Sequence, residues 1–384
     1  MKSIIIQSKR VFISSSFVPA QIEIFGSKIV GIYKYSEKPV DIDYGTKRIL
    51  PGFYDIHTHG YGGYDTTSGD KDGLRKWIKY LPNEGVCGFC PTTLTSGYDT
   101  LIAALKNVNE VYNEKQEGAE ILGIHFEGPY IDAKRKGAQP EEFIVKGTVT
   151  EFNKYQEASG NLIKIITLAP EHDDNFELTK FCSSKGVNVS IGHTSAEYET
   201  AMLAIGNGAR GFTHTYNGMS GFDHRSNGVV GAAFASKDTY AEIIGDGNHS
   251  SLTALNVFFK EKTDHAIMIT DSLMCKGFKV GTKCKFGGQE IEIYEDGSAH
   301  LTSGTKSLAG STLKANEGLK LLIEDALVPQ IEAINSVSLN PMKYLKLDDH
   351  KGMLKVNYDA DIVILNDDYS VEQTYCLGKQ QLKK

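Results

Sequence analysis

The sequence has no excess of basic residues, no long apolar run and no cysteine pattern of a disulfide-rich protein. Its 41 Lys and Arg stand against 48 Asp and Glu, and the formal net charge is -7. A basic surface for nucleic acid is therefore not expected. No apolar run reaches the roughly 18 residues that a membrane-spanning helix needs. We accordingly expect neither nucleic acid nor a membrane among its partners.

Six cysteines in 384 residues form no disulfide framework. The single Cys-x-x-Cys pair, Cys87 and Cys90, is interpreted as two buried structural thiols, since no second pair accompanies it. The apolar stretch near Met1 is too short for the core of a secretory signal. Thiols stay reduced in the cytosol, and the sequence therefore predicts a cytoplasmic protein.

Strand-like and helix-like segments alternate from Ile49 to about residue 335, which is the pattern of βα repeats around a parallel sheet. Eight runs are predicted as its strands: 54–59, 85–95, 121–127, 162–169, 187–193, 211–214, 241–246 and 266–271. Helices are expected between them. Eight such units match a (β/α)8 TIM barrel of the α/β class, whose usual size is close to the length of this segment.

Both ends of the chain contain short β-favouring runs separated by Ser, Gly and Pro. We expect residues 1–50 and 340–384 to form one small β-sandwich domain beside a barrel made of residues 51–339. Within 278–300, the pairs Gly287-Gly288 and Asp296-Gly297 predict hairpin turns.

Two histidines, His57 and His59, stand two residues apart in the first predicted barrel strand. Alternation along a strand places both side chains on one face, about 6–7 Å apart along the chain. The pair alone is also compatible with a polar strand face. It becomes a metal site when other strands supply further ligands.

Six of the eight predicted strand ends carry a residue suited to metal binding or proton transfer. Active sites of TIM barrels lie at the carboxyl ends of the strands, where these side chains would meet. Their joint occurrence favours a metal hydrolase over a set of unrelated buried polar groups. The residues are His57, His59, His125, Glu127, His193, His214, Asp246, His249 and Asp271.

Glu127, His193 and His214 are predicted to hold a metal with one coordination position open for water. Zinc is the first choice for these ligands, and iron, manganese and cobalt also accept them. His125 would lie one layer deeper than Glu127 on the same strand face. Asp271 is the natural general base, because a metal-activated water needs a carboxylate to take its proton.

Several motifs together resemble those of the amidohydrolase superfamily, and within it the N-acetylglucosamine-6-phosphate deacetylase family. The resemblance extends over essentially the whole chain. It rests on Pro51 to Gly60, His125 to Pro129, Ile191 to Thr194, Thr213 to Met219, Asp246 to His249, Thr270-Asp271 and Leu308 to Ser311.

The resemblance implies hydrolysis of the 2-acetamido group of a sugar 6-phosphate, giving an amino sugar phosphate and acetate. Glu127, His193 and His214 match the family's metal ligands, and Asp271 matches its catalytic acid and base. Arg225 and His249 match its phosphate contacts, with the arginine reaching across from the second subunit of a homodimer. Further substrate contacts are implied for Ala138, Gln139, Asn217, Gly218, Leu308, Ala309 and Gly310.

Family members differ in the number of metals that they bind. Those without the His-x-His pair bind one metal and carry a histidine in the loop after the glutamate ligand. This chain has His57 and His59, and it has Gln139 where that histidine would stand. We therefore expect one or two metals per chain, a second one being bridged by Glu127. The second metal would polarise the acetyl carbonyl in place of the absent histidine.

Three alternatives to hydrolysis of an N-acetylglucosamine 6-phosphate stay open. The first is an N-acetylgalactosamine-6-phosphate deacetylase. The second is another amidohydrolase that acts on an N-acyl or cyclic amide; such relatives often use a carboxylated lysine, whereas Lys164 lies near the start of its predicted strand. The third is a non-enzymatic scaffold of the same fold, but such chains usually lose metal ligands.

Overall fold

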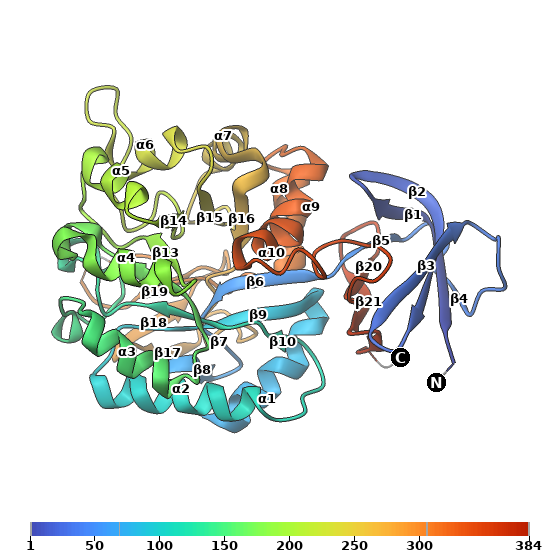
Figure 1. The fold of residues 1–384 in the computed structure, drawn as a ribbon, viewed down its shortest axis with the longest axis horizontal. Helices are drawn as coiled ribbons and strands as arrows, with labels where there is room; N and C mark the ends of the chain where they lie inside the picture. The colour runs from blue at the N-terminus through green and yellow to red at the C-terminus, as the bar shows by residue number, and fades with distance from the viewer. Residues whose placement is uncertain (1, 69, 305, 383–384) are drawn as a thin grey trace.

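Eight parallel strands form a barrel at the centre of the larger part of the molecule (Figure 1). The computed structural model describes residues 2–68, 70–304 and 306–382. All eight predicted strands are confirmed, with ends shifted by a few residues, and the run 121–127 is split into β10 (Glu120–Ile121) and β11. In chain order the barrel strands are β6 (Phe53–Thr58), β9 (Val86–Thr93), β11 (Ile124–Glu127), β12 (Ile163–Leu168), β13 (Asn188–Ile191), β14 (Ala209–Phe212), β15 (Tyr240–Ile244) and β16 (Ala266–Ile269).

The barrel closes where the segment after β16 meets β6. The Asp271 backbone N–H donates to the His57 carbonyl at 2.9 Å. One residue earlier, the Thr270 hydroxyl donates to the Asp55 carboxylate at 2.6 Å. These bonds tie the strand that carries the two histidines to the segment that carries the predicted general base.

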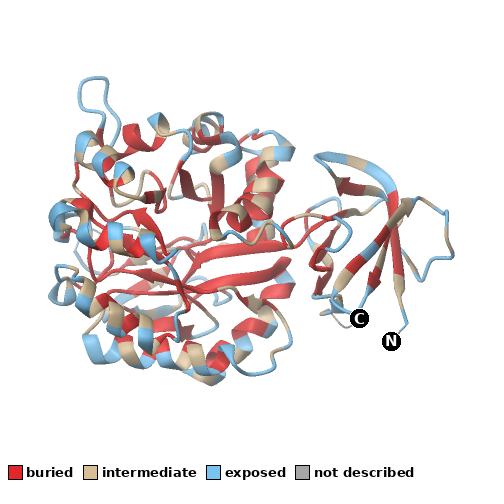
Figure 2. Ribbon diagram, viewed as in Figure 1, coloured by how far each residue is buried: buried red, intermediate tan, exposed pale blue. Residues whose placement is uncertain are grey.

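The helices surround the barrel and turn an apolar face inward. Buried residues fill the strands, and exposed residues lie on the outer faces of the helices (Figure 2). Strands covered on both faces are largely apolar along their length, as β12 is except for Lys164 and Thr167. The helices are α1 (Lys71–Tyr80), α2 (Tyr98–Tyr112), α3 (Val149–Ala158), α4 (Glu177–Ser184), α5 (Tyr198–Gly206), α6 (Gly228–Ala235), α7 (Leu252–Lys262), α8 (Ala315–Glu324), α9 (Gln330–Val337) and α10 (Leu339–Leu345).

The smaller part is a β-rich unit that both ends of the chain build, as expected. Its strands follow the order β22-β21-β20-β5-β1-β2-β3, with β4 beside β1. Ile6, Ile22 and Ile362 belong to its apolar core. Its strands are β1 (Ile4–Ile13), β2 (Ser16–Phe25), β3 (Lys28–Lys34), β4 (Ile42–Asp43), β5 (Arg48–Pro51), β20 (Ile362–Leu365), β21 (Val371–Cys376) and β22 (Lys379–Gln380).

Gly52 joins the two parts, because β5 ends at Pro51 and β6 begins at Phe53. Its backbone N–H donates to the Asp361 carbonyl at 2.8 Å. A Cβ atom at this position would lie 2.4 Å from the Cys87 sulfur, so a larger residue does not fit. The close approach of the two parts thus requires a glycine at the entry to the first barrel strand.

The predicted hairpins after β16 are confirmed. β17 (Lys283–Phe286), β18 (Gln289–Ile293) and β19 (Ala299–Leu301) form an antiparallel sheet. A second short hairpin, β7 (Gly60–Tyr61) with β8 (Tyr64–Asp65), follows β6. One hairpin follows the carboxyl end of β6 in the chain, and the other sheet follows the carboxyl end of β16. Both therefore begin at the end of the barrel where a site is expected.

A buried ion pair joins three segments of the barrel wall. The Lys276 ammonium lies 2.9 Å from a Glu84 carboxylate oxygen, and both side chains are fully buried. Glu84 also accepts the backbone N–H of Ala315 at the start of α8, at 3.2 Å. The pair therefore connects the loop after β16, the turn before β9 and α8.

Lys276→Met is expected to destabilise the fold by about 3–5 kcal/mol, because it leaves the Glu84 carboxylate buried without its cation. Thermal and denaturant unfolding of the purified protein measure the loss. Lys71→Met, which breaks an exposed ion pair with Glu110, is the matched control and should change little. The double variant Lys276→Met/Glu84→Leu should recover part of the stability; an equal or greater loss would contradict the explanation.

Across residues 2–68, 70–304 and 306–382, the helices are all too short or too polar to cross a membrane.

Candidate metal centre and active site

The strands deliver the predicted ligands to one place at their carboxyl ends. His57 belongs to β6, His59 follows it, and Glu127 is the last residue of β11. His193, His214 and Asp271 each stand two residues beyond the end of a strand, and all three have positive φ angles, of 48°, 29° and 48°. Such backbone is rare for residues other than glycine and is common at functional sites.

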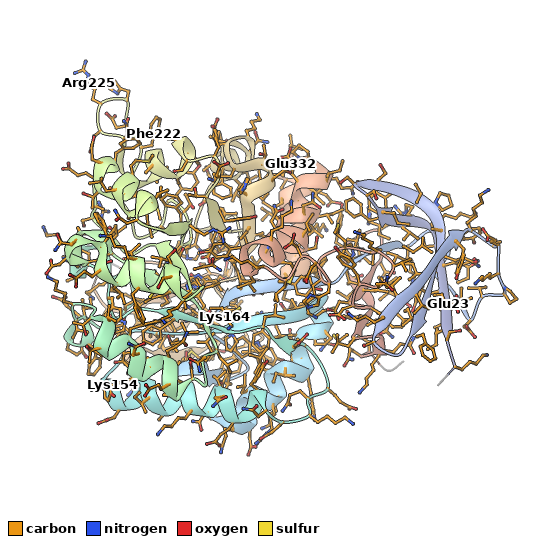
Figure 3. The ribbon with its side chains drawn as sticks, viewed as in Figure 1. Glu23, Lys154, Lys164, Phe222, Arg225 and Glu332 are labelled. Carbon is orange, nitrogen blue, oxygen red and sulfur yellow. The ribbon has the colours of Figure 1, made fainter. Side chains whose placement is uncertain are left out.

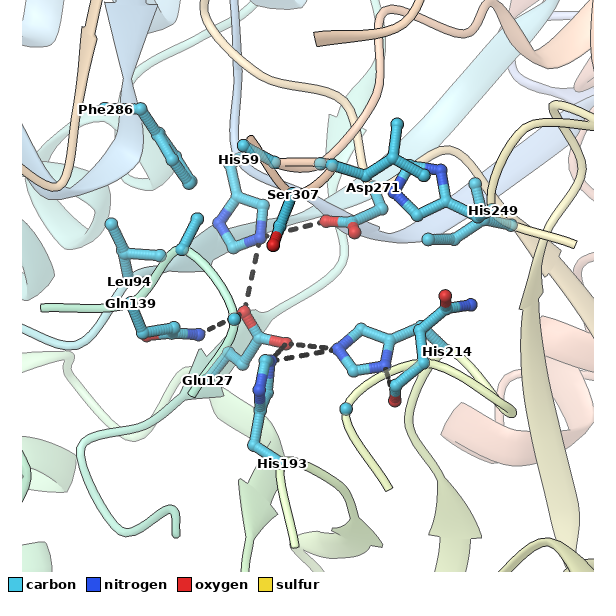
Figure 4. Close-up of a pocket in the computed structure, with 18 residues that line it drawn as sticks. His59, Leu94, Glu127, Gln139, His193, His214, His249, Asp271, Phe286 and Ser307 are labelled. Carbon is cyan, nitrogen blue, oxygen red and sulfur yellow. Dashed lines mark hydrogen bonds and ion pairs between the residues drawn. The ribbon is translucent and has the colours of Figure 1, made fainter. Parts of the chain in front are cut away.

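Three ligand atoms form a tight triangle in the pocket (Figure 4). The Nε2 atoms of His193 and His214 lie 3.1 Å apart, and they lie 3.3 and 3.2 Å from Oε1 of Glu127. Ligands about 2.0–2.1 Å from a tetrahedral zinc ion are about 3.3 Å from one another. The triangle therefore has the size of a metal-binding set.

The outer nitrogens of the two histidines fix which ring nitrogen faces the triangle. His193 Nδ1 lies 2.7 Å from the Arg135 carbonyl, and His214 Nδ1 lies 3.0 Å from the Asn217 carbonyl. A carbonyl only accepts, so each Nδ1 carries the proton and each Nε2 presents a lone pair. Two lone pairs that face each other cannot form a hydrogen bond, whereas a shared cation satisfies both, and the residues thus fit a divalent metal.

A second cluster shares Glu127 with the first. His57 Nε2 lies 3.3 Å from Glu127 Oε1, and His59 Nε2 lies 3.3 Å from Glu127 Oε2. Both histidines also approach Asp271 Oδ1, at 3.5 and 3.1 Å. His57, His59 and Glu127 form one potential metal-binding group, and Glu127, His193 and His214 form another. The arrangement offers two neighbouring cation positions with Glu127 between them.

The charges of the cluster are strongly coupled. Burial alone would favour neutral acids, but the charge of His57 and the contacts with His193 and His214 hold the pKa of Glu127 well below its ordinary value. Burial likewise opposes ionisation of Asp271, yet the His59 hydrogen bond lowers its pKa to about 2. Although burial disfavours a charged His59, the two carboxylates raise its pKa to about 9. The carboxylates thus require positive charge beside them, which protons or metal cations can supply.

A cavity of about 250 Å³ opens above these ligands. Thirteen of the predicted site residues line it, whereas His57 is fully buried and is absent from its lining. Arg225 is not part of the lining either; it stands at the tip of an exposed loop that projects from the barrel (Figure 3). The predicted residues that line the cavity are His59, Glu127, Ala138, Gln139, His193, His214, Asn217, Gly218, His249, Asp271, Leu308, Ala309 and Gly310.

Gln139 has both ends of its amide fixed by the protein. Its Nε2 donates to Glu127 Oε2 at 2.9 Å, and its Oε1 accepts the Thr95 backbone N–H at 2.7 Å. The side chain is 2% exposed. Gln139 therefore holds the shared carboxylate in place, and its amide has little freedom to turn toward a substrate.

His249 presents a ring edge to the cavity from the loop after β15. Its Nδ1 lies 2.6 Å from Asp246 Oδ2. Although burial lowers the pKa of His249, the hydrogen bond to Asp246 and the carboxylate charge raise it above its ordinary value. A protonated imidazole at this position suits an anionic group of a ligand.

Some pocket residues were not predicted from the sequence. Leu94, Ile244 and Phe286 supply apolar walls, and Phe286 packs edge-on against His59 with ring centroids 5.7 Å apart. Phe286 comes from β17 in the hairpin sheet, and no local pattern showed that this sheet would reach the pocket. Glu242 lies beneath the cavity and contacts His57 Nδ1 at 2.9 Å. As the only charged residue in β15, it did carry a signal.

The sequence matches the amidohydrolase family over residues 48–380. The chain belongs to the amidohydrolase family. It is similar, with 41% identity over 334 residues, to the N-acetylglucosamine-6-phosphate deacetylase of Bacillus subtilis strain 168, covering 86% of this chain and 83% of that protein. It is 32% identical over 333 residues to an N-acetylgalactosamine-6-phosphate deacetylase of Escherichia coli O157:H7, covering 86% and 87% of the two chains.

A solved structure of a similar protein has the same fold as this amidohydrolase. The N-acetylglucosamine-6-phosphate deacetylase of Pasteurella multocida superposes with a TM-score of 0.92 at 25% identity, and the match covers 100% of both chains. The likeness includes the β-rich part as well as the barrel.

The alternative with a carboxylated lysine as metal ligand is not supported at Lys164. This residue is exposed near the start of β12, and its ammonium donates to the Asn161 carbonyl at 3.2 Å.

Proposed function

We propose that this amidohydrolase removes the acetyl group of N-acetyl-D-glucosamine 6-phosphate, giving D-glucosamine 6-phosphate and acetate. The observation that carries the proposal is one cavity lined by potential metal ligands together with Asp271 and His249; the ligands in the lining are His59, Glu127, His193 and His214. The names of the similar proteins support the same substrate class. The galactosamine derivative is the second candidate, because one relative with 32% identity acts on it according to its name.

In this reaction Asp271 moves the protons. A divalent cation held by Glu127, His193 and His214 would activate the water, and a second one held by His57, His59 and Glu127 would polarise the acetyl carbonyl as a Lewis acid. The Asp271 carboxylate, held ionised by His59, takes a proton from the attacking water and delivers one to the departing nitrogen. His249 binds the phosphate by charge. We propose zinc as the metal; iron, manganese and cobalt suit the same ligands.

The remaining predicted contacts are assigned by their positions in the cavity. We propose that Asn217 and Gly218 bind the sugar beside His214, and that Ala138 with Gln139 forms the opposite wall. Leu308, Ala309 and Gly310, which follow the hairpin sheet, cover the acetyl group. Their lining positions support these roles.

Acetate release from purified protein loaded with metal tests the function. N-acetylglucosamine 6-phosphate, its galacto epimer and unphosphorylated N-acetylglucosamine should be compared at equal concentration. The gluco 6-phosphate is expected to give the highest kcat/KM, and the sugar without phosphate the lowest. Absence of acetate from both 6-phosphates would contradict the proposal, and faster release from the galacto epimer would reassign the substrate.

We further propose a homodimer in which Arg225 of each subunit reaches the phosphate in the active site of the other. Residues 221–227 are exposed, and Phe222 at 61% exposure leaves an apolar ring on the same loop. Arg225 projects away from the body of the chain that carries it (Figure 3). Guanidinium binds phosphate through paired hydrogen bonds, which a contact from a second subunit would supply.

Arg225→Ala is expected to raise KM for the sugar phosphate by about 10- to 100-fold, the effect of losing a charge-assisted contact. Turnover of the unphosphorylated sugar should not change. Arg225→Lys keeps the charge, so its KM for the sugar phosphate should lie between those of Arg225→Ala and the wild type. Mixing Arg225→Ala with Asp271→Asn subunits gives a stricter test: if the arginine acts across the dimer, the mixed dimer has one complete site and activity returns. No recovery in demonstrably mixed dimers would contradict the exchange.

Two further assignments belong to this proposal. We propose a cytoplasmic location, which the six free cysteines support, since a reducing compartment maintains free thiols. We also propose that residues 1–50 and 340–384 act as one β domain that supports a barrel of residues 51–339. The link at Gly52, the ion pair of Lys351 with Glu120 at 2.8 Å and the hydrogen bond from the Tyr54 hydroxyl to Asp361 at 2.9 Å support a fixed arrangement of the two.

A further inference from the structure

We propose that Glu242 is a positioning residue that sets the number of metal ions per chain, by holding His57 in the orientation and tautomer that a second cation needs. The inference rests on the proposed function, and it deepens the description of the same site. Glu242 lies in β15 and is 2% exposed. Its side chain points into the barrel interior, where it meets His57 of β6 and the segment after β14.

One oxygen of Glu242 contacts two of the metal-binding segments. Oε2 lies 2.9 Å from His57 Nδ1 and accepts the backbone N–H of His214 at 3.3 Å. The Glu242 carbonyl separately accepts the Thr215 backbone N–H at 2.8 Å. Because that last bond belongs to the main chain, a substitution at Glu242 removes the side-chain contacts while the pairing beyond β14 remains.

The contact determines which nitrogen of His57 is available. A carboxylate accepts, so His57 Nδ1 carries the proton and Nε2 presents its lone pair. That lone pair points to the second cluster, 3.3 Å from Glu127 Oε1 and 3.5 Å from Asp271 Oδ1. A carboxylate behind a ligating histidine also raises the basicity of the ring, and removal of such a partner typically costs 10- to 100-fold in metal affinity.

The dependence on a side chain is specific to His57. His193 and His214 are oriented by main-chain carbonyls, of Arg135 and Asn217, which no side-chain substitution removes. Within the described chain, His59 Nδ1 has no hydrogen-bond partner. The cluster of Glu127, His193 and His214 is thus largely independent of Glu242, whereas the second cluster depends on it through His57.

The surroundings of Glu242 offer no replacement for it. Its Oε1 has no hydrogen-bond partner among the described residues and lies 3.9 Å from His125 Nδ1. His125 is already bonded on both sides, with Nδ1 3.1 Å from the Ile56 carbonyl and Nε2 2.7 Å from the Thr167 hydroxyl. The ring centroids of His57 and His125 are 4.4 Å apart, so His125 packs against His57 without accepting a hydrogen bond from it. Glu242 is therefore the acceptor for the Nδ1 proton of His57.

Glu242→Met and Glu242→Asp are the decisive variants. Methionine keeps the length of the side chain and removes the acceptor, and aspartate keeps the charge but withdraws the oxygen from His57. After loading with zinc and dialysis, elemental analysis should find two metals per wild-type chain and one in each variant. Titration with a chelator should show the weaker site losing affinity by about 10- to 100-fold, while the tighter site keeps its affinity.

Three comparisons separate this role from a merely structural one. Glu242→Gln, which retains an oxygen acceptor, should recover part of the weaker site. Adding Glu242→Met to a His57→Asn chain should change metal content no further. Glu261→Leu, at an exposed carboxylate on α7, should bind two metals as the wild type does.

Two metals with unchanged chelator sensitivity in the methionine and aspartate variants would overturn the role of Glu242. A single metal in the wild type would overturn it as well. Neither result touches the proposed function, which acetate release from the sugar phosphate tests separately. If the methionine variant does not fold, the aspartate variant decides by the same two measurements.

Discussion

Asp271→Asn is expected to lower kcat by about 10²- to 10⁴-fold, the usual contribution of a positioned general acid and base. The amide has nearly the same shape as the carboxylate, but it cannot accept a proton from water and pass it to the leaving nitrogen. Steady-state kinetics of acetate release measure the change. KM should move far less than kcat, because the group acts on the reacting atoms.

Metal content is the control for this variant. Asp271 Oδ1 is close to His57 and His59, so a part of the loss could come from the second cation position. The ion held by Glu127, His193 and His214 should remain, which elemental analysis establishes. A variant with its metal intact and a kcat within a few-fold of the wild type would show that another group moves the protons.

His57→Asn is expected to lose one of two metals and most of the activity. Asparagine cannot replace Nε2 at the second cluster, where that atom lies 3.3 Å from Glu127 Oε1. If the second cation polarises the acetyl carbonyl, its loss removes a Lewis acid from the transition state. Elemental analysis and kcat on the same preparation measure both effects.

The same experiment tests why glutamine suffices at position 139. Gln139 is bound to Glu127 and to Thr95, so it supports the shared ligand and does not supply a proton donor to the substrate. His57→Gln serves as a second substitution of the same ligand and should behave as the asparagine variant does. One metal in the wild type with full activity would refute the two-metal hypothesis.

Much of the fold could be predicted from the sequence because βα repeats leave a regular local pattern. Each barrel strand is a short buried run, and each was recognisable by its apolar residues and the turn residues around it. The predicted site residues fall at strand ends, where the topology of a barrel brings them together. Sequence reasoning therefore needed only the order of the strands to place His193 next to His214.

The rest of the site depends on contacts between distant segments. Phe286 reaches the cavity from a hairpin sheet whose position relative to the barrel no local pattern determines. The orientation of Gln139 depends on the Thr95 backbone N–H, 44 positions away. Glu242 was visible as a lone charge in an apolar strand, but its partner His57 stands 185 positions earlier. Such pairings appear only when the barrel is closed.

The small β sheet also imposes an order on the folding of the nascent chain. Leu50 of β5 pairs with Val363 of β20, more than 300 positions later. The edge of β5 that pairs with β20 therefore stays open during translation until β20 has left the ribosome. Open edges invite wrong pairing, and pairing over such distances is slow. Since β6 begins two residues after β5 ends, the strand that contains His57 and leads to His59 becomes anchored at its start only after β20 has been synthesised.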